Sequence, residues 1–326
     1  MSAQEQLVLD VRNLRVTISS PTRGVVRAVD GVSFRVCRGE TLGIVGESAS
    51  GKSMTALGIM RLQPPNAQVE AEQIWFEGQD LVRLTQQQMR RLRGRRIAMI
   101  PQDPTTSLNP AFTMGDQLSE PLALHRRLRG AVLRDEVIAA LRRVKVPAPE
   151  HRVHQFPHQL SGGMRQRVVG AIAFSCNPVL LIADEPTTAL DVTIQHQILR
   201  LLKELQRQIG VGLIFITHDL SLAWRMCDRV AVMYAGRIVE TGPVGDLFAN
   251  PRHPYTAALL ACLPTRDSVE RLGVIEGSPP DPAAFPSGCR FAPRCSRAED
   301  ACRVKYPEET QLKRDRSFSC FLPMRT

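Results

Sequence analysis

The stretch that decides the fold is Gly46-Glu47-Ser48-Ala49-Ser50-Gly51-Lys52-Ser53, which matches G-x-x-x-x-G-K-[ST] at every position. The apolar run before it, Leu42–Val45, predicts a strand, and Ser53–Leu62 after it predicts a helix. In that context backbone N–H groups of the loop cradle phosphate oxygens, Lys52 reaches the β- and γ-phosphates, and the Ser53 hydroxyl ligates Mg²⁺. The sequence therefore predicts a site for ATP or GTP.

A second apolar run, Val179–Ala183, ends in two carboxylates, Asp184 and Glu185. An Asp-Glu pair at a strand end is by itself more often a helix cap or a solvated charge. After a phosphate loop the pair is the expected partner, in which Asp184 holds the Mg²⁺ shell and Glu185 polarises an attacking water.

The remaining hydrophobic pattern predicts alternating strands and helices, which is typical of a parallel α/β sheet. Short extended runs occupy residues 7–45, and a helical pattern extends from about Gly115 to Val146. Further helices are expected over Met164–Ser175, Thr193–Ile209 and Ser221–Cys227, and further strands over Val8–Val11, Leu14–Ile18, Val32–Val36, Ile97–Ile100, Leu213–Thr217 and Val230–Tyr234. We expect a nucleotide-binding domain over residues 1–245, with a helical subdomain at about 110–165, and an irregular extension over 246–326.

Composition narrows the class of protein. The chain has 326 residues, of which 43% are hydrophobic and 23% charged, so it has enough apolar material for a packed core. No apolar run approaches the roughly 18 residues of a membrane span, and the N-terminus lacks a signal-peptide pattern, which predicts a soluble, cytoplasmic protein. The net charge is +10, and part of it lies in an arginine-rich run over residues 83–96. This run is either a solvated face or a contact to membrane headgroups or a partner.

The stretch Leu160-Ser-Gly-Gly-Met-Arg-Gln166, where Ser and two glycines open a helix, resembles the signature of the ATP-binding cassette (ABC) family, and the resemblance extends over residues 7–245. It implies an ABC-type P-loop NTPase, with a small antiparallel β-subdomain and a helical subdomain beside the parallel core. In that family the signature contacts the nucleotide held by the opposite subunit, and the corresponding residues here are Ser161, Gly162, Gly163 and Gln166.

The same resemblance assigns the remaining roles. Glu185 is the general base and acts with Lys52, while Gln102 joins the Mg²⁺ and water shell and senses a membrane partner. Asp191 belongs to a loop that crosses the dimer interface, and His218 contacts the γ-phosphate. The chain departs from the family at Ala49, where Gly is frequent, at Pro101, where Phe is common, and at the adenine-stacking position, for which the candidates are Val16, Ile18 and Arg27.

Three stretches, 102–110, 184–191 and 250–260, resemble dipeptide and oligopeptide importer ATPases. This implies a peripheral ATPase at the cytoplasmic face of the inner membrane, with no direct nucleic-acid contact. It also implies a heterodimer with a second ABC ATPase subunit, two transmembrane permeases and an extracytoplasmic peptide-binding protein. Related branches of the family carry nickel, glutathione or other small solutes, so the cargo stays open.

Four of the eight cysteines lie in the C-terminal segment as Cys289-x₅-Cys295-x₆-Cys302-x₁₇-Cys320. Four thiolates suit a tetrahedral zinc or a [4Fe–4S] cluster, and free thiols are a third possibility. The resemblance to dipeptide importer ATPases implies the [4Fe–4S] cluster. We expect its role to be structural, because this segment has little apolar content for a core of its own.

Two rival functions use the same motifs. One is a non-transport ABC ATPase that acts on nucleic acid or ribosomes, and the other is a redox-responsive binding module. The single cassette and the lack of sustained heptads disfavour the first. The second predicts ATPase activity that responds to oxidation of a cluster.

Overall fold

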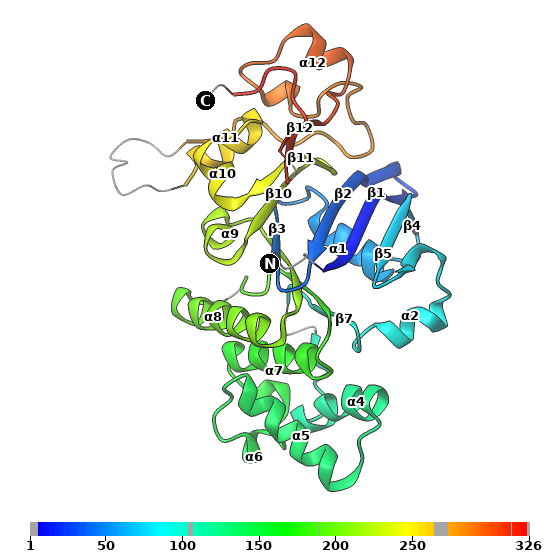
Figure 1. The fold of residues 1–326 in the computed structure, drawn as a ribbon, viewed down its shortest axis with the longest axis vertical. Helices are drawn as coiled ribbons and strands as arrows, with labels where there is room; N and C mark the ends of the chain where they lie inside the picture. The colour runs from blue at the N-terminus through cyan, green and yellow to red at the C-terminus, as the bar shows by residue number, and fades with distance from the viewer. Residues whose placement is uncertain (1–5, 104–106, 189, 264–272, 314, 325–326) are drawn as a thin grey trace. The chain divides into compact units, whose positions relative to one another are not determined.

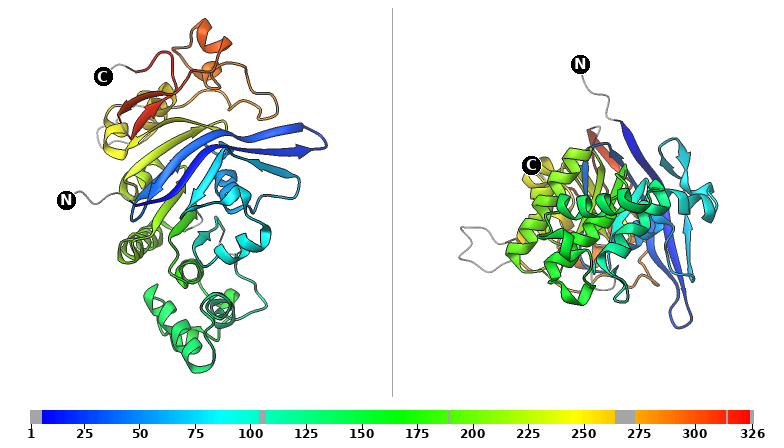
Figure 2. Two further views of the ribbon diagram at one scale, coloured as in Figure 1. Left: turned by 45° about the vertical axis from the view of Figure 1, so that its right-hand side comes forward. Right: turned by 90° about the horizontal axis from the view of Figure 1, so that it is seen from below.

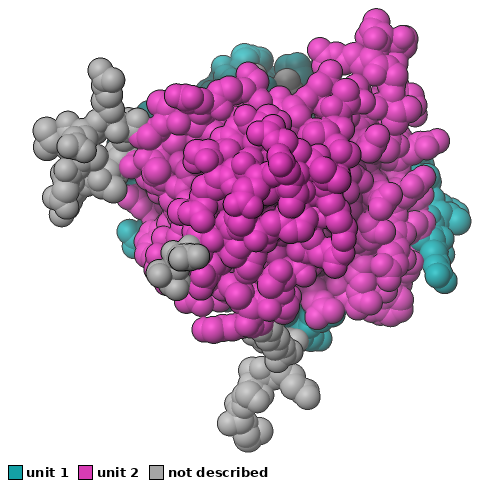
Figure 3. Space-filling model, turned by 90° about the horizontal axis from the view of Figure 1, so that it is seen from above, with its two compact units in different colours: residues 1–8, 36–40, 83–214 teal, residues 9–35, 41–82, 215–326 magenta. Residues whose placement is uncertain are grey.

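The structure is a computed structural model that describes residues 6–103, 107–188, 190–263, 273–313 and 315–324. The chain forms two compact units, which are interleaved along the sequence (Figure 3). Unit 1 comprises residues 1–8, 36–40 and 83–214, and unit 2 comprises residues 9–35, 41–82 and 215–326. Each unit is described by itself.

Unit 2 contains an antiparallel sheet with the strand order β2-β1-β5-β6, in which β4 also pairs with β1. The long blue ribbons of Figure 2 are β1 and β2. Two predicted strands are a single strand here, because Asn13, with φ 52°, interrupts the alternation without ending the pairing. The bounds are β1 Leu7–Ser20, β2 Gly24–Cys37, β4 Ala67–Glu70, β5 Gln73–Phe76 and β6 Gln79–Asp80.

A second sheet of unit 2 carries the phosphate loop. Strand β3 (Thr41–Val45) is buried throughout and pairs in parallel with β10 (Arg229–Tyr234). Strand β11 (Arg237–Pro243) pairs antiparallel with β10 on one side and with β13 (Arg316–Phe318) on the other. Strand β12 (Thr310–Lys313) pairs with β13. The helices of this unit are α1 Lys52–Met60, α9 Leu220–Met226, α10 Val244–Ala249, α11 Pro254–Ala261 and α12 Asp300–Val304, with the 3₁₀ turns η1, Leu81–Arg83, at the boundary of the unit and η3 Ala292–Arg294.

The C-terminal segment contains helices and strands, and its aromatic residues pack against β10. Tyr255 of α11 and Phe291 pack around Tyr234 of β10, with ring centroids 4.5 Å and 5.3 Å from the Tyr234 ring. All three side chains are buried. The aromatic residues of this segment are therefore buried against β10 as well as against one another.

Unit 1 contains the parallel pair β7 (Ile97–Ile100) and β8 (Leu180–Asp184), with Ile97 opposite Leu180. Its helices, from α2 to α8, are the cyan to yellow-green ribbons of Figure 1. The predicted helical stretch 115–146 forms two helices, because α4 ends where Arg127 adopts φ 57°. The elements are α2 Gln86–Leu92, α4 Met114–Arg126, α5 Gly130–Arg143, α6 Pro149–Arg152, η2 Pro157–Gln159, α7 Gly162–Phe174 and α8 Val192–Ile209, followed by β9 Gly212–Thr217, which begins in unit 1 and ends in unit 2.

Candidate nucleotide site

The phosphate loop folds around the Lys52 ammonium group. Lys52 Nζ donates hydrogen bonds to the carbonyl oxygens of Gly46 and Glu47, both at 2.8 Å, and to Ser50 Oγ at 3.4 Å. The residue is only 5% exposed. Burying an ammonium group costs free energy unless it has hydrogen-bond partners, and the loop supplies three. The Lys52 cation is therefore held inside the loop, where its attraction to a phosphate anion would be strong.

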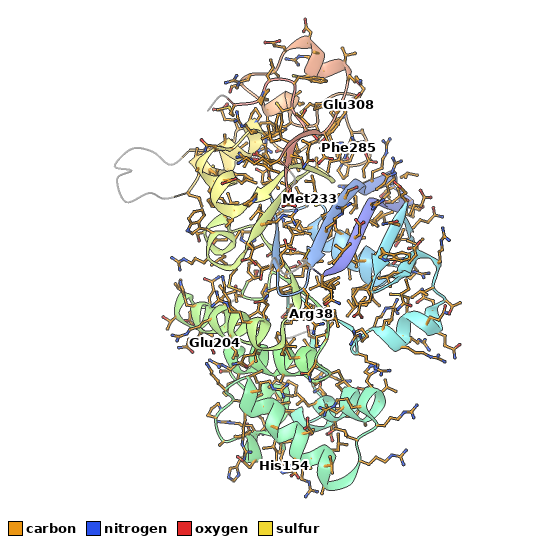
Figure 4. The ribbon with its side chains drawn as sticks, in the orientation of Figure 1. Arg38, His154, Glu204, Met233, Phe285 and Glu308 are labelled. Carbon is orange, nitrogen blue, oxygen red and sulfur yellow. The ribbon has the colours of Figure 1, made fainter. Side chains whose placement is uncertain are left out.

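Two glycines of the loop are required by its geometry. Gly46 has φ 155° and Gly51 has φ 105°. A Cβ atom on Gly46 would clash with the carbonyl oxygen of Met233, a residue labelled in Figure 4, and one on Gly51 would clash with the carbonyl oxygen of Ala28. Ala49, with φ 61°, adopts the left-handed conformation that favours glycine. The departure noted in the sequence thus falls at a position where glycine would relieve backbone strain.

In unit 1 the structure brings Gln102 and Glu185 together. Gln102 Nε2 donates to Glu185 Oε2 at 3.2 Å, and Thr188 Oγ1 donates to the same oxygen at 2.9 Å. Glu185 has φ 44°, whereas Asp184 ends strand β8 and is buried. The two carboxylates are therefore presented differently, one within the strand and one on a strained turn that two donors orient.

The signature and Asp191 also lie close together in unit 1. Ser161 caps helix α7 by accepting a hydrogen bond from Met164 N, and Asp191 caps helix α8 by accepting one from Ile194 N at 2.9 Å. A Cβ atom on Gly163 would come within 2.6 Å of Ile194 Cγ2, so the two helix starts are in close contact. Gln166 is 3% exposed, and its Oε1 has no hydrogen-bond partner.

The other predicted residues are distributed between the units. Ser53, in helix α1, and His218, an exposed residue after β9, belong to unit 2, whereas Gln102, Asp184, Glu185 and the signature belong to unit 1. Val16 is fully buried and offers no surface to a base, while Ile18 is half-buried and Arg27 is exposed. Residues 104–106 and Ala189, which belong to stretches that resemble peptide importers, lie outside the described residues.

Comparison with known proteins adds the family. The profile described as ABC transporter matches residues 29–188, and the one described as oligopeptide/dipeptide transporter, C-terminal region, matches residues 239–302. The dipeptide transport ATP-binding protein DppD of Bacillus subtilis (strain 168) is 49% identical over 97% of this chain and 94% of its own length. The oligopeptide transport ATP-binding protein OppD of the same strain is 52% identical over 89% of this chain and 82% of its own length.

The chain belongs to the ATP-binding subunits of the oligopeptide/dipeptide ABC transporter family. Members of this family are ATPases coupled to transport, and so is this chain. A solved dimer of an ATP-binding cassette in a post-hydrolysis state with ADP and phosphate is 27% identical to it, with a TM-score of 0.65 over 72% of this chain and 98% of that one. The solved structure of cbiO1 from Clostridium perfringens, part of an ABC transporter complex, is 28% identical to this chain. Its TM-score is 0.63 over 75% of this chain and 92% of that one. The predicted ABC fold is confirmed.

The predicted iron–sulfur cluster of this peptide-transporter ATPase is contradicted. Cys289, Cys295, Cys302 and Cys320 line one small cavity, but the described residues contain no group of three or more His, Cys, Asp or Glu side chains that could hold a metal ion. Burial raises the pKa of Cys289 and Cys295, and it raises that of Cys320 to about 11, so the cavity favours neutral thiols over free thiolates. The cysteine clustering predicted proximity correctly, whereas neither the [4Fe–4S] cluster nor zinc is supported.

Three residues at the phosphate loop were missed at the sequence level. Arg294, Tyr255 and Tyr234 surround Glu47, the second residue of the loop: Arg294 forms an ion pair with its carboxylate, and Tyr255 Oη accepts a hydrogen bond from its N–H at 3.0 Å. Little in the sequence indicates this contact, because Arg294 is far from the loop along the chain. The only local feature that distinguishes it is its place in the stretch Arg290–Cys295. The loop of this ABC ATPase is thus bounded by residues of the C-terminal segment.

Proposed function

We propose that this chain hydrolyses ATP to drive the uptake of dipeptides or oligopeptides across the cytoplasmic membrane. The observation that carries the proposal is the phosphate loop of unit 2, with its buried Lys52, in a chain that belongs to the peptide-transporter ATPases. DppD and OppD, named for dipeptide and oligopeptide transport, supply the cargo class. Nickel, glutathione or another small solute is the alternative cargo.

In this proposal the loop residues 46–53 bind the phosphates of ATP through backbone N–H groups and Lys52. The donor set of Ser53, Gln102 and Asp184, a hydroxyl, an amide and a carboxylate, fits Mg²⁺, which prefers oxygen ligands and supplies charge neutralisation on the phosphates. The adenine position is assigned to Ile18 or Arg27, since Val16 is buried.

Glu185 acts as the base in the proposed hydrolysis. It takes a proton from water while the water oxygen attacks the γ-phosphorus, and the bond to the β–γ bridging oxygen breaks to give ADP and phosphate. Gln102, which donates to Glu185, orients this carboxylate. His218 and Lys52 bind the γ-phosphate, and the signature of the opposite subunit, equivalent to Ser161, Gly162, Gly163 and Gln166 here, completes the site beside Asp191.

The domain division that we propose is a nucleotide-binding domain over residues 1–245, with a helical subdomain at about 110–165, and a C-terminal extension over 246–326. The two family profiles, which match residues 29–188 and 239–302, support a change of character near residue 240. The two compact units cut across this division, because β13 of the extension pairs with β11 of the domain.

We further propose that unit 1 docks a cytoplasmic loop of a permease. A groove in this unit is lined by apolar Phe112 and Leu124 and by acidic Asp116 and Glu120. The two apolar side chains are 52% and 68% exposed. Cytoplasmic loops of membrane proteins are enriched in Lys and Arg, which complements this apolar and acidic surface.

The full proposed assembly contains two permeases, a second ABC ATPase subunit and an extracytoplasmic peptide-binding protein. None of the helices in the described part of the chain is long and apolar enough to span a membrane. We assign membrane attachment to the permeases, at the cytoplasmic face of the membrane.

The test is affinity purification of the chain from detergent-solubilised native membranes, followed by identification of its partners. We expect two permeases and a second ATPase with the wild type, and loss of the permeases with Leu124→Asp. Val132→Asp, which alters another exposed apolar residue of unit 1, is the matched control. Ribosomes or nucleic acid as the main partners would contradict the transport function, and uptake of labelled nickel but not dipeptide would contradict the cargo.

A further inference from the structure

The phosphate loop carries a negative charge of its own. Glu47 follows the first glycine, and its backbone carbonyl oxygen accepts a hydrogen bond from Lys52 Nζ, so the residue belongs to the wall of the phosphate cradle. A carboxylate on this wall repels the phosphate anions that the loop is built to bind. The general loop pattern accepts any residue at this position, so the charge requires an explanation in this chain.

Arg294 of η3 neutralises that charge. Its guanidinium is bidentate on the carboxylate, with Nη1 2.7 Å from Oε2 and Nη2 3.0 Å from Oε1 of Glu47. The Arg294 side chain is 4% exposed, whereas Glu47 is 27% exposed. Bidentate arginine–carboxylate pairs that are shielded from water are the strong class of ion pair.

The Arg294 guanidinium is also held in place by hydrogen bonds to groups other than Glu47. Its remaining hydrogen bonds run from Nε to the Glu276 carbonyl at 2.9 Å, from Nη2 to the Ile275 carbonyl at 3.1 Å and from Nη1 to Tyr234 Oη at 3.3 Å. With the two bonds to Glu47 this makes five, which equals the number of N–H groups on a guanidinium. Arg294 therefore positions Glu47 instead of following it.

A second arginine of the same short stretch supports the loop from the other end. Arg290 donates to the Ala235 carbonyl and to Asp30, and it lies 3.7 Å above the ring centroid of Phe285, which Figure 4 labels. Gly236, which follows Ala235 in the chain, donates from its N–H to the carbonyl oxygen of Ser50 at 2.8 Å. The stretch from Arg290 to Arg294 thus contacts the loop directly at Glu47 and indirectly at Ser50.

We propose that Arg294 is a positioning residue for nucleotide binding, which neutralises Glu47 and fixes the phosphate loop in its binding shape. The C-terminal segment then sets the nucleotide affinity of the cassette. The inference rests on the proposed function, in that the loop must bind nucleotide phosphates.

The test is a double-mutant cycle on the full-length chain, with MgADP affinity measured by calorimetry. Arg294→Met leaves a carboxylate unpaired beside the phosphates, and we expect a loss of about tenfold. Glu47→Gln breaks the same ion pair but leaves no negative charge beside the phosphates, so we expect its MgADP affinity to fall by only about threefold. The double variant should match Glu47→Gln, at about threefold, instead of reaching the roughly thirtyfold of two independent losses.

The matched control is Lys305→Met, which removes the cation of an exposed ion pair with Glu308 in the same C-terminal segment. We expect its affinity to stay within about twofold of the wild type. An unchanged affinity in Arg294→Met, additive losses in the double variant, or an equal loss in Lys305→Met would each overturn the inference. A wild type that does not bind MgADP would overturn the proposed function and this inference with it, whereas normal wild-type binding with unaffected variants would overturn the inference alone.

A measurement on the wild type covers the case in which Arg294→Met does not fold. Because coupling between two sites is reciprocal, MgADP should slow amide hydrogen exchange in residues 289–295 as well as in the loop. Protection confined to the loop would contradict the coupling. Arg294→Lys keeps the charge but loses the bidentate geometry, so we expect its MgADP affinity to lie between those of the wild type and Arg294→Met.

Discussion

Gln102 Nε2 donates a hydrogen bond to Glu185 Oε2 at 3.2 Å, so the amide that follows strand β7 orients the carboxylate that follows strand β8. Both residues stand just beyond the carboxyl ends of two parallel strands. Polar side chains at this edge of a parallel sheet are held by rigid strands while the chemistry takes place outside the sheet. The pair links the proposed base to the residue proposed to sense the membrane partner.

The first prediction concerns Glu185. Glu185→Gln keeps the shape and the hydrogen bond acceptor for Gln102 but cannot take a proton from water, so we expect ATP hydrolysis to fall by about 10²- to 10⁴-fold. ATP affinity should remain, because the loop and Lys52 are untouched. Steady-state ATPase assays and equilibrium binding of ATP separate the two effects.

The control for this variant is Glu204→Gln on helix α8, a half-buried carboxylate labelled in Figure 4 that pairs with Lys145 and Arg200. We expect its hydrolysis rate to resemble that of the wild type. Hydrolysis by Glu185→Gln within about tenfold of the wild type would remove Glu185 as the base.

The second prediction concerns the shape of the phosphate loop. Gly51→Ala places a methyl group against the Ala28 carbonyl at a φ of 105°, so we expect a loss of about 2–4 kcal/mol in the free energy of unfolding and a loss of MgADP binding. Gly245→Ala is the matched control, since a Cβ there meets no atom within 4 Å. Thermal unfolding and calorimetric binding measure the two effects. Normal binding by Gly51→Ala would show that the loop relaxes away from this geometry.

The third prediction compares neighbouring glycines of the signature. A Cβ on Gly163 would lie 2.6 Å from Ile194 Cγ2, whereas one on Gly162 would lie 3.6 Å from Leu190 Cδ2, an ordinary contact. We expect Gly163→Ala to lower the free energy of unfolding by about 1–3 kcal/mol and Gly162→Ala to change it by less than about 1 kcal/mol. Chemical denaturation of the two variants checks the order, and a reversed order would contradict the close contact of α7 with α8.

The fourth prediction concerns acid stability. His253 is buried, accepts a hydrogen bond from Tyr255 N at Nδ1, and has a pKa lowered by burial to about 3. Below pH 6.5 the unfolded chain binds a proton at His253 that the folded chain does not bind until about pH 3, so the free energy of unfolding falls as the pH falls through this window. Between pH 7.5 and 5 the loss attributable to His253 is about 2 kcal/mol.

His253→Asn isolates this effect, because an asparagine side chain keeps an acceptor for the helix start but does not titrate. Glu240, which accepts from His253 N at 2.8 Å, has a pKa raised by burial and therefore acts in the opposite direction, in wild type and variant alike. The free energy of unfolding of the wild type relative to that of the variant should fall by about 2 kcal/mol between pH 7.5 and 5. Parallel pH profiles would show that His253 does not carry the dependence.

Much of the fold could be predicted because its signals are local. The strands β3, β8 and β9 are continuous apolar runs, and the phosphate loop is a contiguous motif between a strand and a helix. The residues proposed for the candidate site were likewise predicted from short local motifs. The pairing of Gln102 with Glu185 follows once both are placed at neighbouring strand ends.

What could not be predicted depends on residues far apart in the chain. Glu47 and Arg294 are separated by 247 positions, and neither has a local pattern that identifies the other. The four C-terminal cysteines show what spacing along the sequence can and cannot predict. Their spacing predicted that they gather, but whether thiols meet as metal ligands is decided by backbone turns and burial, which spacing does not encode.

The pairing of β13 with β11, through Glu240 opposite Phe318, has a consequence for biosynthesis. A ribosome makes β11 long before it makes β13, so during translation the backbone N–H and C=O groups along that side of β11 have no strand beside them. Such an edge is a template for pairing with another nascent chain. Strand β13, which covers this aggregation-prone edge, is therefore made only after β11, and termination before β13 would leave a cassette that carries its phosphate loop but associates with its neighbours.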